Sequence, residues 1–94
     1  MVTKYRLKDD VQEWNGEGDS TILFSPSTSK YFGTNEAGIC LARRMSDWCR
    51  VEDLAGVLEA EYGLEHSTAV DDSSSFLKLI LAAGIAQKRS WIWS

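Results

Sequence analysis

The chain has 94 residues, 44% of them hydrophobic and 11% aromatic, which suffices for one compact domain with a single core of limited depth. Its formal net charge of −4 opposes nonspecific binding to nucleic acid, because that binding depends on lysines and arginines that displace counterions from phosphates. No apolar run approaches the roughly 18 residues of a membrane span, and the N-terminal segment lacks the hydrophobic stretch of a secretion signal. We therefore expect a cytoplasmic protein.

Three antiparallel strands are predicted in the first third of the chain. The first is irregular and extends from about Tyr5 to Trp14, before a turn that contains two glycines. The second covers about Ser20 to Ser25, and Pro26 with the hydroxyl residues after it forms the next turn. A short third strand covers Lys30 to Thr34. Strands in this order form an antiparallel meander, with the third strand at an edge.

Three segments with helical periodicity follow. The first is predicted from Glu36 to Ser46, after Asn35, whose side-chain oxygen can accept hydrogen bonds from the first helical turn. The second is predicted from Val51 to Tyr62 and the third from Thr68 to Ala83. A glycine follows each of these two segments, as is common where the backbone turns left-handed at a helix C-terminus.

The third predicted helix has apolar residues on two faces. A core-facing stripe would need only one of them, so either both faces are buried or the second is a binding surface. The sequence leaves both possibilities open. The first face comprises Val70, Ser73, Leu77, Ile80 and Leu81, and the second comprises Phe76, Leu79 and Ala83.

Several single residues have predictable roles. Gly38 costs its helix about 1 kcal/mol relative to alanine, so we expect close packing of the backbone against the strands there. Cys40, Cys49 and His66 match no usual zinc or redox spacing. We expect the cysteines to be small buried hydrophobes and His66 to be a solvated loop residue. No metal site and no cofactor are predicted.

The segment 86–94 ends with Trp91, Ile92 and Trp93, which favour either a last short strand or an apolar anchor. These tryptophans either cover the core of the domain or contact a partner protein or a second copy of the chain. Lys88 and Arg89 beside them could meet nucleic acid, meet an acidic surface on a partner, or only solvate the terminus. The sequence does not decide between these alternatives.

Five motifs follow one another at a characteristic spacing: D-S-T-I-L-F, S-P-S-T-S-K-Y-F-G, T-N-E-A-G-I-C-L, V-E-D-L-A-G-V-L-E-A-E-Y-G and D-S-S-S-F-L-K-L-I-L-A-A-G-I. Together they resemble the PqqD-like family, the peptide-recognition elements of pathways that make ribosomally synthesised, post-translationally modified peptides (RiPPs). The resemblance covers about Ser20 to Ile85. It fits the standalone proteins that serve lasso-peptide proteases about as well as the member of the pyrroloquinoline quinone pathway.

This resemblance implies an α+β fold, a winged helix-turn-helix in which a three-stranded antiparallel sheet packs on three helices. The whole chain, 1–94, would be one domain with a core at about 20–85 and a tryptophan-containing tail at 86–94. The leader segment of a precursor peptide would add as a strand beside the third strand and lie against the third helix. The implied peptide-binding residues are Lys30, Tyr31, Phe32, Gly33, Asp72, Ser75, Phe76, Leu79 and Ala83.

Simpler roles for some of these residues remain open. Alternation along a strand directs at least one of Tyr31 and Phe32 away from a groove. Lys30 could discourage association between sheet edges. Asp72 either orients a basic leader residue or only interacts favourably with the helix dipole.

The chain departs from the family pattern at three positions. Thr34 replaces a usual leucine, Arg50 replaces a usual capping threonine or serine, and Ser73 replaces a usual valine or isoleucine of the core. The changes at Thr34 and Ser73 are expected to weaken packing rather than the binding surface.

The leading hypothesis is a non-catalytic adaptor that presents a precursor peptide to a modifying enzyme, namely a leader protease, a cyclase or a radical SAM enzyme. The alternative is a winged-helix DNA-binding regulator, which the acidic start of the third helix and its single cation, Lys78, disfavour. A small enzyme lacks any set of nucleophile, base and orienting group that the sequence places together. A homodimer formed by strand exchange remains possible.

Overall fold

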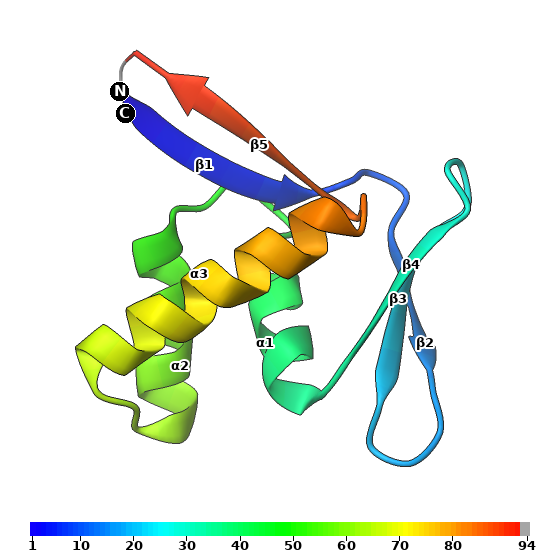
Figure 1. Ribbon diagram of the computed structural model, residues 1–94, viewed down its shortest axis with the longest axis horizontal. Coiled ribbons are helices and arrows are strands. Elements are labelled where there is room, and N and C mark those ends of the chain that lie inside the picture. Colours follow the sequence, from blue (N-terminus) through cyan, green and yellow to red (C-terminus); the bar gives the residue numbers. More distant parts are fainter. Residues whose placement is uncertain (93–94) are drawn as a thin grey trace.

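The computed structural model describes residues 1–92, and it contains three helices and five strands in two sheets (Figure 1). Strands β2, β3 and β4 form the predicted antiparallel meander, with β4 at an edge, and a second sheet pairs β1 with β5. The winged helix-turn-helix arrangement is confirmed. The elements are β1 Val2–Leu7, β2 Gln12–Asn15, β3 Thr21–Ser25, β4 Lys30–Thr34, α1 Glu36–Arg44, α2 Val51–Tyr62, α3 His66–Ala82 and β5 Ala86–Trp91.

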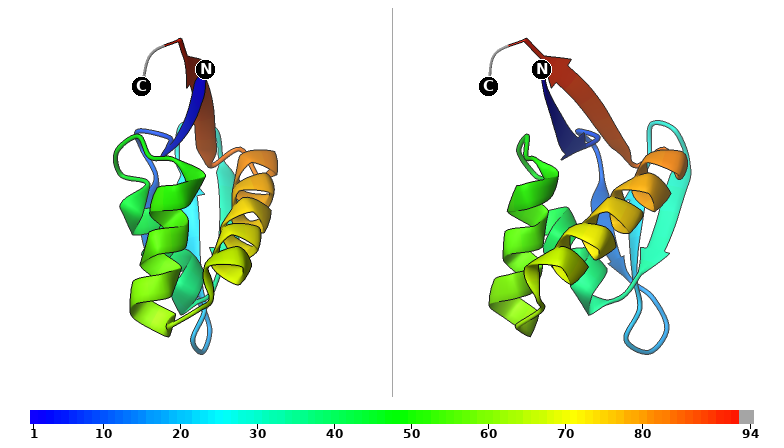
Figure 2. Two further views of the ribbon diagram at one scale, coloured as in Figure 1. Left: turned by 90° about the vertical axis from the view of Figure 1, so that its left-hand side faces the viewer. Right: turned by 60° about the vertical axis from the view of Figure 1, so that its left-hand side comes forward.

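The prediction of one strand from Tyr5 to Trp14 is wrong, because two separate strands occupy this segment. β1 pairs with β5 from the other end of the chain, whereas β2 pairs with β3. The break lies at Lys8, whose N–H donates to the carbonyl of Ile85 at 2.9 Å. Figure 2 shows the resulting β1–β5 ribbon, blue and red, extending beyond the helices with the N-terminus at its tip.

Backbone hydrogen bonds fix this ribbon to the segment between α1 and α2. Tyr5 and Cys49 exchange two of them, at 2.7 and 2.9 Å, and the N–H of Leu7 donates to the carbonyl of Met45 at 2.9 Å. Cys49 is buried as expected, and this burial raises the pKa of its thiol to about 11, so the thiol stays protonated. Cys40 is only partly buried, which corrects the expectation for that residue.

The start of α1 agrees with the sequence. Asn35 Oδ1 accepts a hydrogen bond from the N–H of Gly38 at 3.0 Å, which confirms the predicted cap. A Cβ atom at Gly38 would clash with the side chain of Thr34, so the expected close approach to the strands is real. The helix ends at Arg44, two residues before the predicted end.

The C-terminal ends of α2 and α3 also agree with the prediction from the sequence, but the start of α3 does not. Gly63 and Gly84, with φ of 64° and 77°, follow α2 and α3 in the left-handed conformation. α3 begins at His66 instead of Thr68, after Glu65, whose carbonyl accepts from the N–H of Ala69 at 2.9 Å. His66 is therefore a helical residue, and its Nδ1 lies 3.2 Å from a carboxylate oxygen of Glu59 on α2.

The core lies between the helices and the inner face of the meander. Its largest fully buried side chains include Leu23, Met45, Leu54, Ile80 and Ile85. Among residues 1–92, no helix is long and apolar enough to cross a membrane. The core-facing stripe predicted for α3 is only partly confirmed, since Ser73, Leu77 and Ile80 are buried but Val70 and Leu81 are half-buried.

Ser73 is an imperfect core residue. Its side chain is fully buried, and its hydroxyl has no hydrogen-bond partner among the described residues. A buried hydroxyl without a partner costs folding free energy, because it loses its hydrogen bonds to water.

Replacing Ser73 with alanine should therefore raise the free energy of unfolding by about 1–2 kcal/mol. The variant no longer buries a hydroxyl without a partner, and alanine has the higher helix propensity. Urea denaturation of Ser73→Ala and wild type would measure the change. Ser74→Ala is the matched control, because the half-buried Ser74 gains the same helix propensity. An equal gain in both variants would contradict a special cost at Ser73.

Asp10 holds the turn between β3 and β4 from the loop that joins β1 to β2. Its two carboxylate oxygens accept hydrogen bonds from the N–H of Ser27 and the hydroxyl of Ser25, both at 2.7 Å. These bonds, those from Ser27 first, lower the pKa of Asp10 from 3.8 to about 2.

A lowered pKa in the folded state stabilises the fold fully above pH 3.8, and this contribution disappears as the pH falls towards 2. Asp10→Asn should reduce stability at neutral pH and weaken its dependence on pH across this window. Thermal denaturation at several pH values would measure both effects, with the exposed Asp19→Asn as control. Parallel curves for wild type and Asp10→Asn would contradict the assignment.

Candidate groove between β4 and α3

An open groove of about 640 Å³ lies between β4 and α3, with α1 and α2 beneath it. One side consists of the end of β4, and the other of one face of α3. The lining residues are Phe32, Gly33, Thr34, Asn35, Ala37, Gly38, Leu41, Leu58, Tyr62, Leu64, Asp72, Ser75, Phe76 and Leu79.

The strand beside this groove has a free edge. β4 pairs with β3 on one side, and no strand within residues 1–92 pairs with its other side. Alternate residues of an antiparallel strand direct their N–H and C=O groups to the same side, so the free edge offers unpaired donors and acceptors at regular spacing. Such an edge can accept an additional extended chain.

The groove is apolar at its base and partly exposed at its wall. Leu41 of α1 and Leu58 of α2 are each only 3% exposed and form the base. Phe76 is 8% exposed, and its ring meets the ring of Phe32 edge to face at 6.0 Å between centroids. Leu79 is 59% exposed on the same face of α3. An apolar side chain that entered the groove would cover both surfaces.

Asp72 is the charged residue among those that line the groove. It lies at the rim, on the exposed side of the first half of α3. Tyr62 adds a phenol, and desolvation and a contact with the Cys40 thiol at 4.0 Å raise its pKa above the usual value. The groove is therefore apolar with one negative charge at its margin.

The structure brings together six of the nine residues that the sequence analysis assigned to peptide binding. They come from the end of β4 and from the second face of α3, and both segments line one groove. The six residues are Phe32, Gly33, Asp72, Ser75, Phe76 and Leu79.

The other three assigned residues lie outside the groove. Tyr31 is 69% exposed and pairs with Phe24, one residue out of phase with Phe32, so it belongs to the outer face of the sheet. The side chain of Lys30 lies against Gly84. Ala83 follows the last turn of α3 and is half-buried.

The base of the groove could not be predicted from the sequence. Leu41 and Leu58 lie on the apolar stripes of α1 and α2, a pattern that predicts burial but does not reveal an opening above the stripe. Thr34 was expected to affect packing alone, yet it also lines the groove. Gly38 lies against the side chain of Thr34 and could have indicated this proximity, since a glycine within a helix indicates that another segment approaches closely.

A comparison with protein families matches residues 20–86 to the family described as coenzyme PQQ synthesis protein D (PqqD). The chain belongs to the PqqD family. The match extends from the start of β3 to the start of β5, so it includes the whole groove. The resemblance identified from the motifs is thus confirmed. A comparison with curated proteins finds no match.

Two solved structures share the fold of this PqqD-family chain. One is TbiB1 in complex with the TbiA(beta) leader peptide, 22% identical, with a TM-score of 0.70 over 87% of this chain and 94% of that one. The other is a lasso peptide synthetase B1 complexed with the leader peptide, 20% identical, with a TM-score of 0.69 over 88% of this chain and 96% of that one. At these identities the likeness shows a shared fold.

Proposed function

We propose that this protein is a non-catalytic adaptor that captures the leader segment of a ribosomally synthesised precursor peptide. The observation that carries the proposal is the free edge of β4 beside an apolar groove. An extended peptide can bond to such an edge through its main chain, while pockets next to the edge select some of its side chains. Membership of the PqqD family supports the proposal, and so do the leader peptides in both solved structures.

The proposed complex places the peptide as a further strand next to Lys30, Phe32 and Gly33. Every second peptide side chain then points into the groove, because side chains alternate along a strand. Bulky apolar residues fit the surface formed by Phe76 and Leu79, and a lysine or arginine can approach Asp72. Tyr31, on the outer face, would contact the peptide side chains that point away from the groove.

The protein would present the rest of the precursor to a modifying enzyme, namely a leader protease, a cyclase or a radical SAM enzyme. We place this assembly in the cytoplasm, and the proposed binding requires no cofactor. DNA binding is the less favoured alternative, since α3 carries Lys78 as its single cation together with Asp71 and Asp72.

The probe is the leader peptide encoded by the precursor gene nearest to the gene of this protein. Leu79→Asp should weaken its binding by at least about tenfold, because the bound peptide would bury the new carboxylate against apolar side chains. Leu79 is exposed enough for the variant to fold. Ser74→Asp, on the same helix but outside the groove, is the matched control and should bind like wild type. Calorimetric titration would measure both affinities. Undiminished binding by folded Leu79→Asp would show that the groove is not the peptide-binding site.

Strand addition also predicts a pattern of hydrogen exchange. Peptide binding should slow exchange at alternate amides of β4 that face its free edge, whereas amides already bonded to β3 should change little. Exchange measured residue by residue by NMR would test this. Protection confined to α3, with β4 unchanged, would show that the peptide binds without joining the sheet.

A further inference from the structure

The basic residues of this acidic chain are concentrated in the β1–β5 ribbon. Segments 1–8 and 86–92 contain five of the ten lysines and arginines and none of the 14 acidic residues. The remainder of the chain has nine more acidic than basic residues. The ribbon is thus a cationic projection on an anionic body.

The two faces of this ribbon differ. Residues paired across an antiparallel ribbon lie on the same face, which places Lys4 with Arg89 and Val2 with Trp91 on the outer one. The inner face carries Tyr5, which bonds to the backbone of Cys49 and packs against the core.

Cationic side chains lie against indole rings on the outer face. Trp91 meets Trp48 edge to face at 5.0 Å between ring centroids. Lys4 Nζ and the guanidinium of Arg89 each lie 5.4 Å from the Trp91 ring, and the guanidinium of Arg6 lies 5.4 Å from the Trp48 ring. These cation–π contacts hold long side chains in place at the surface.

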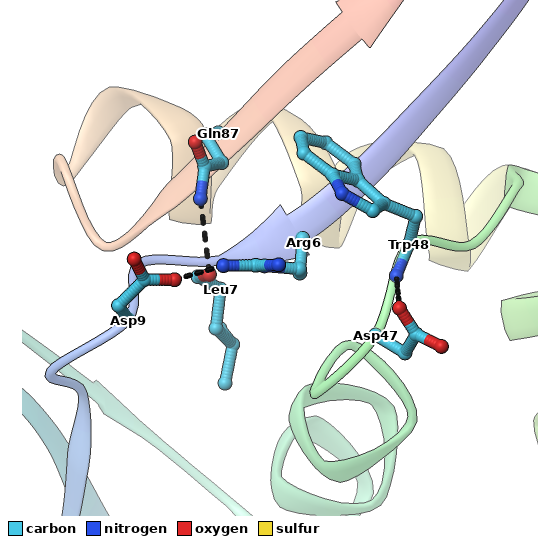
Figure 3. Close-up of polar contacts among 6 residues, drawn as sticks. All are labelled: Arg6, Leu7, Asp9, Asp47, Trp48 and Gln87. Carbon is cyan, nitrogen blue, oxygen red and sulfur yellow. Dashed lines mark hydrogen bonds and ion pairs between the residues drawn. The ribbon is translucent and has the colours of Figure 1, made fainter.

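The charges on this face are largely uncompensated. Arg6 is paired with Asp9 and lies near the side chain of Gln87, which donates to the carbonyl of Leu7 (Figure 3). Within residues 1–92, Lys4 and Arg89 take part in no ion pair, nor do Lys8 and Lys88 elsewhere on the ribbon. None of these basic residues lines the groove.

We propose that the outer face of the β1–β5 ribbon, formed by Lys4, Arg6, Trp48, Arg89 and Trp91, docks an acidic surface of a second protein. The face combines arginine and tryptophan, the residue types that contribute most binding energy at protein interfaces. Because the ribbon shares no lining residue with the groove, both surfaces can be occupied at the same time.

A protein fits this face better than nucleic acid does. Asp9 and Asp47 flank the ribbon, and Asp47 accepts a hydrogen bond from the N–H of Trp48 at 2.8 Å (Figure 3). A duplex would bring its phosphates close to these carboxylates and to the acidic body. A folded partner can instead place its own carboxylates only where the cations lie.

The test is an NMR titration of the full chain with two probes, a dodecaglutamate peptide and a twelve-base-pair DNA duplex, at low and at physiological ionic strength. Dodecaglutamate should shift the amides of β1 and β5 and the indole N–H signals of Trp48 and Trp91. Lys4→Glu/Arg89→Glu should lower its affinity at least about tenfold. Lys78→Glu, a single charge reversal on α3, is the control away from the ribbon and should lower it less than about twofold.

Shifts spread evenly over the molecule would overturn the proposal, as would tighter binding of the duplex than of dodecaglutamate at physiological salt. The outcome is separable from that of the proposed function. Leu79→Asp should leave the dodecaglutamate shifts intact, and Lys4→Glu/Arg89→Glu should leave leader binding intact.

Discussion

The groove depends on how α3 lies relative to β4, and the contact between Phe32 and Phe76 links these two elements. The two rings meet edge to face at 6.0 Å, and both residues line the groove. Leu77 and Ile80 fix the opposite side of α3 in the core. This arrangement leaves Leu79 exposed and the edge of β4 unpaired. The proposed binding surface therefore consists of an exposed leucine beside an unpaired strand edge.

The elements that local chemistry determines could be predicted from the sequence. Asn35 and the glycines after α2 and α3 define helix ends through interactions within a few residues. The division of the first strand could not be predicted, because β1 acquires its partner from the far end of the chain. The start of α3 could not be predicted for a related reason: Glu65 provides no side-chain cap, and the imidazole of His66 contacts the carboxylate of Glu59 on another helix.

The candidate site shows the same limit. The sequence indicated two apolar faces on α3 and an edge strand, and these supply the walls of the groove. Periodicity could not separate a leucine beneath an opening, such as Leu41 or Leu58, from one sealed in the core, because both belong to the same apolar stripe. It also could not decide which of Tyr31 and Phe32 faces inward. Pairing of Phe32 with the fully buried Leu23 decides it.

The pairing of Val2 with Trp91 brings the two ends of the described chain together at the tip of the ribbon, away from the groove. A domain or label fused to either end would therefore emerge next to the tryptophan-bearing strand and leave the β4 edge unobstructed. A bulky fusion at either end should leave the proposed peptide groove open but would crowd the cationic face. Attachment at either end therefore preserves the groove at the expense of the ribbon.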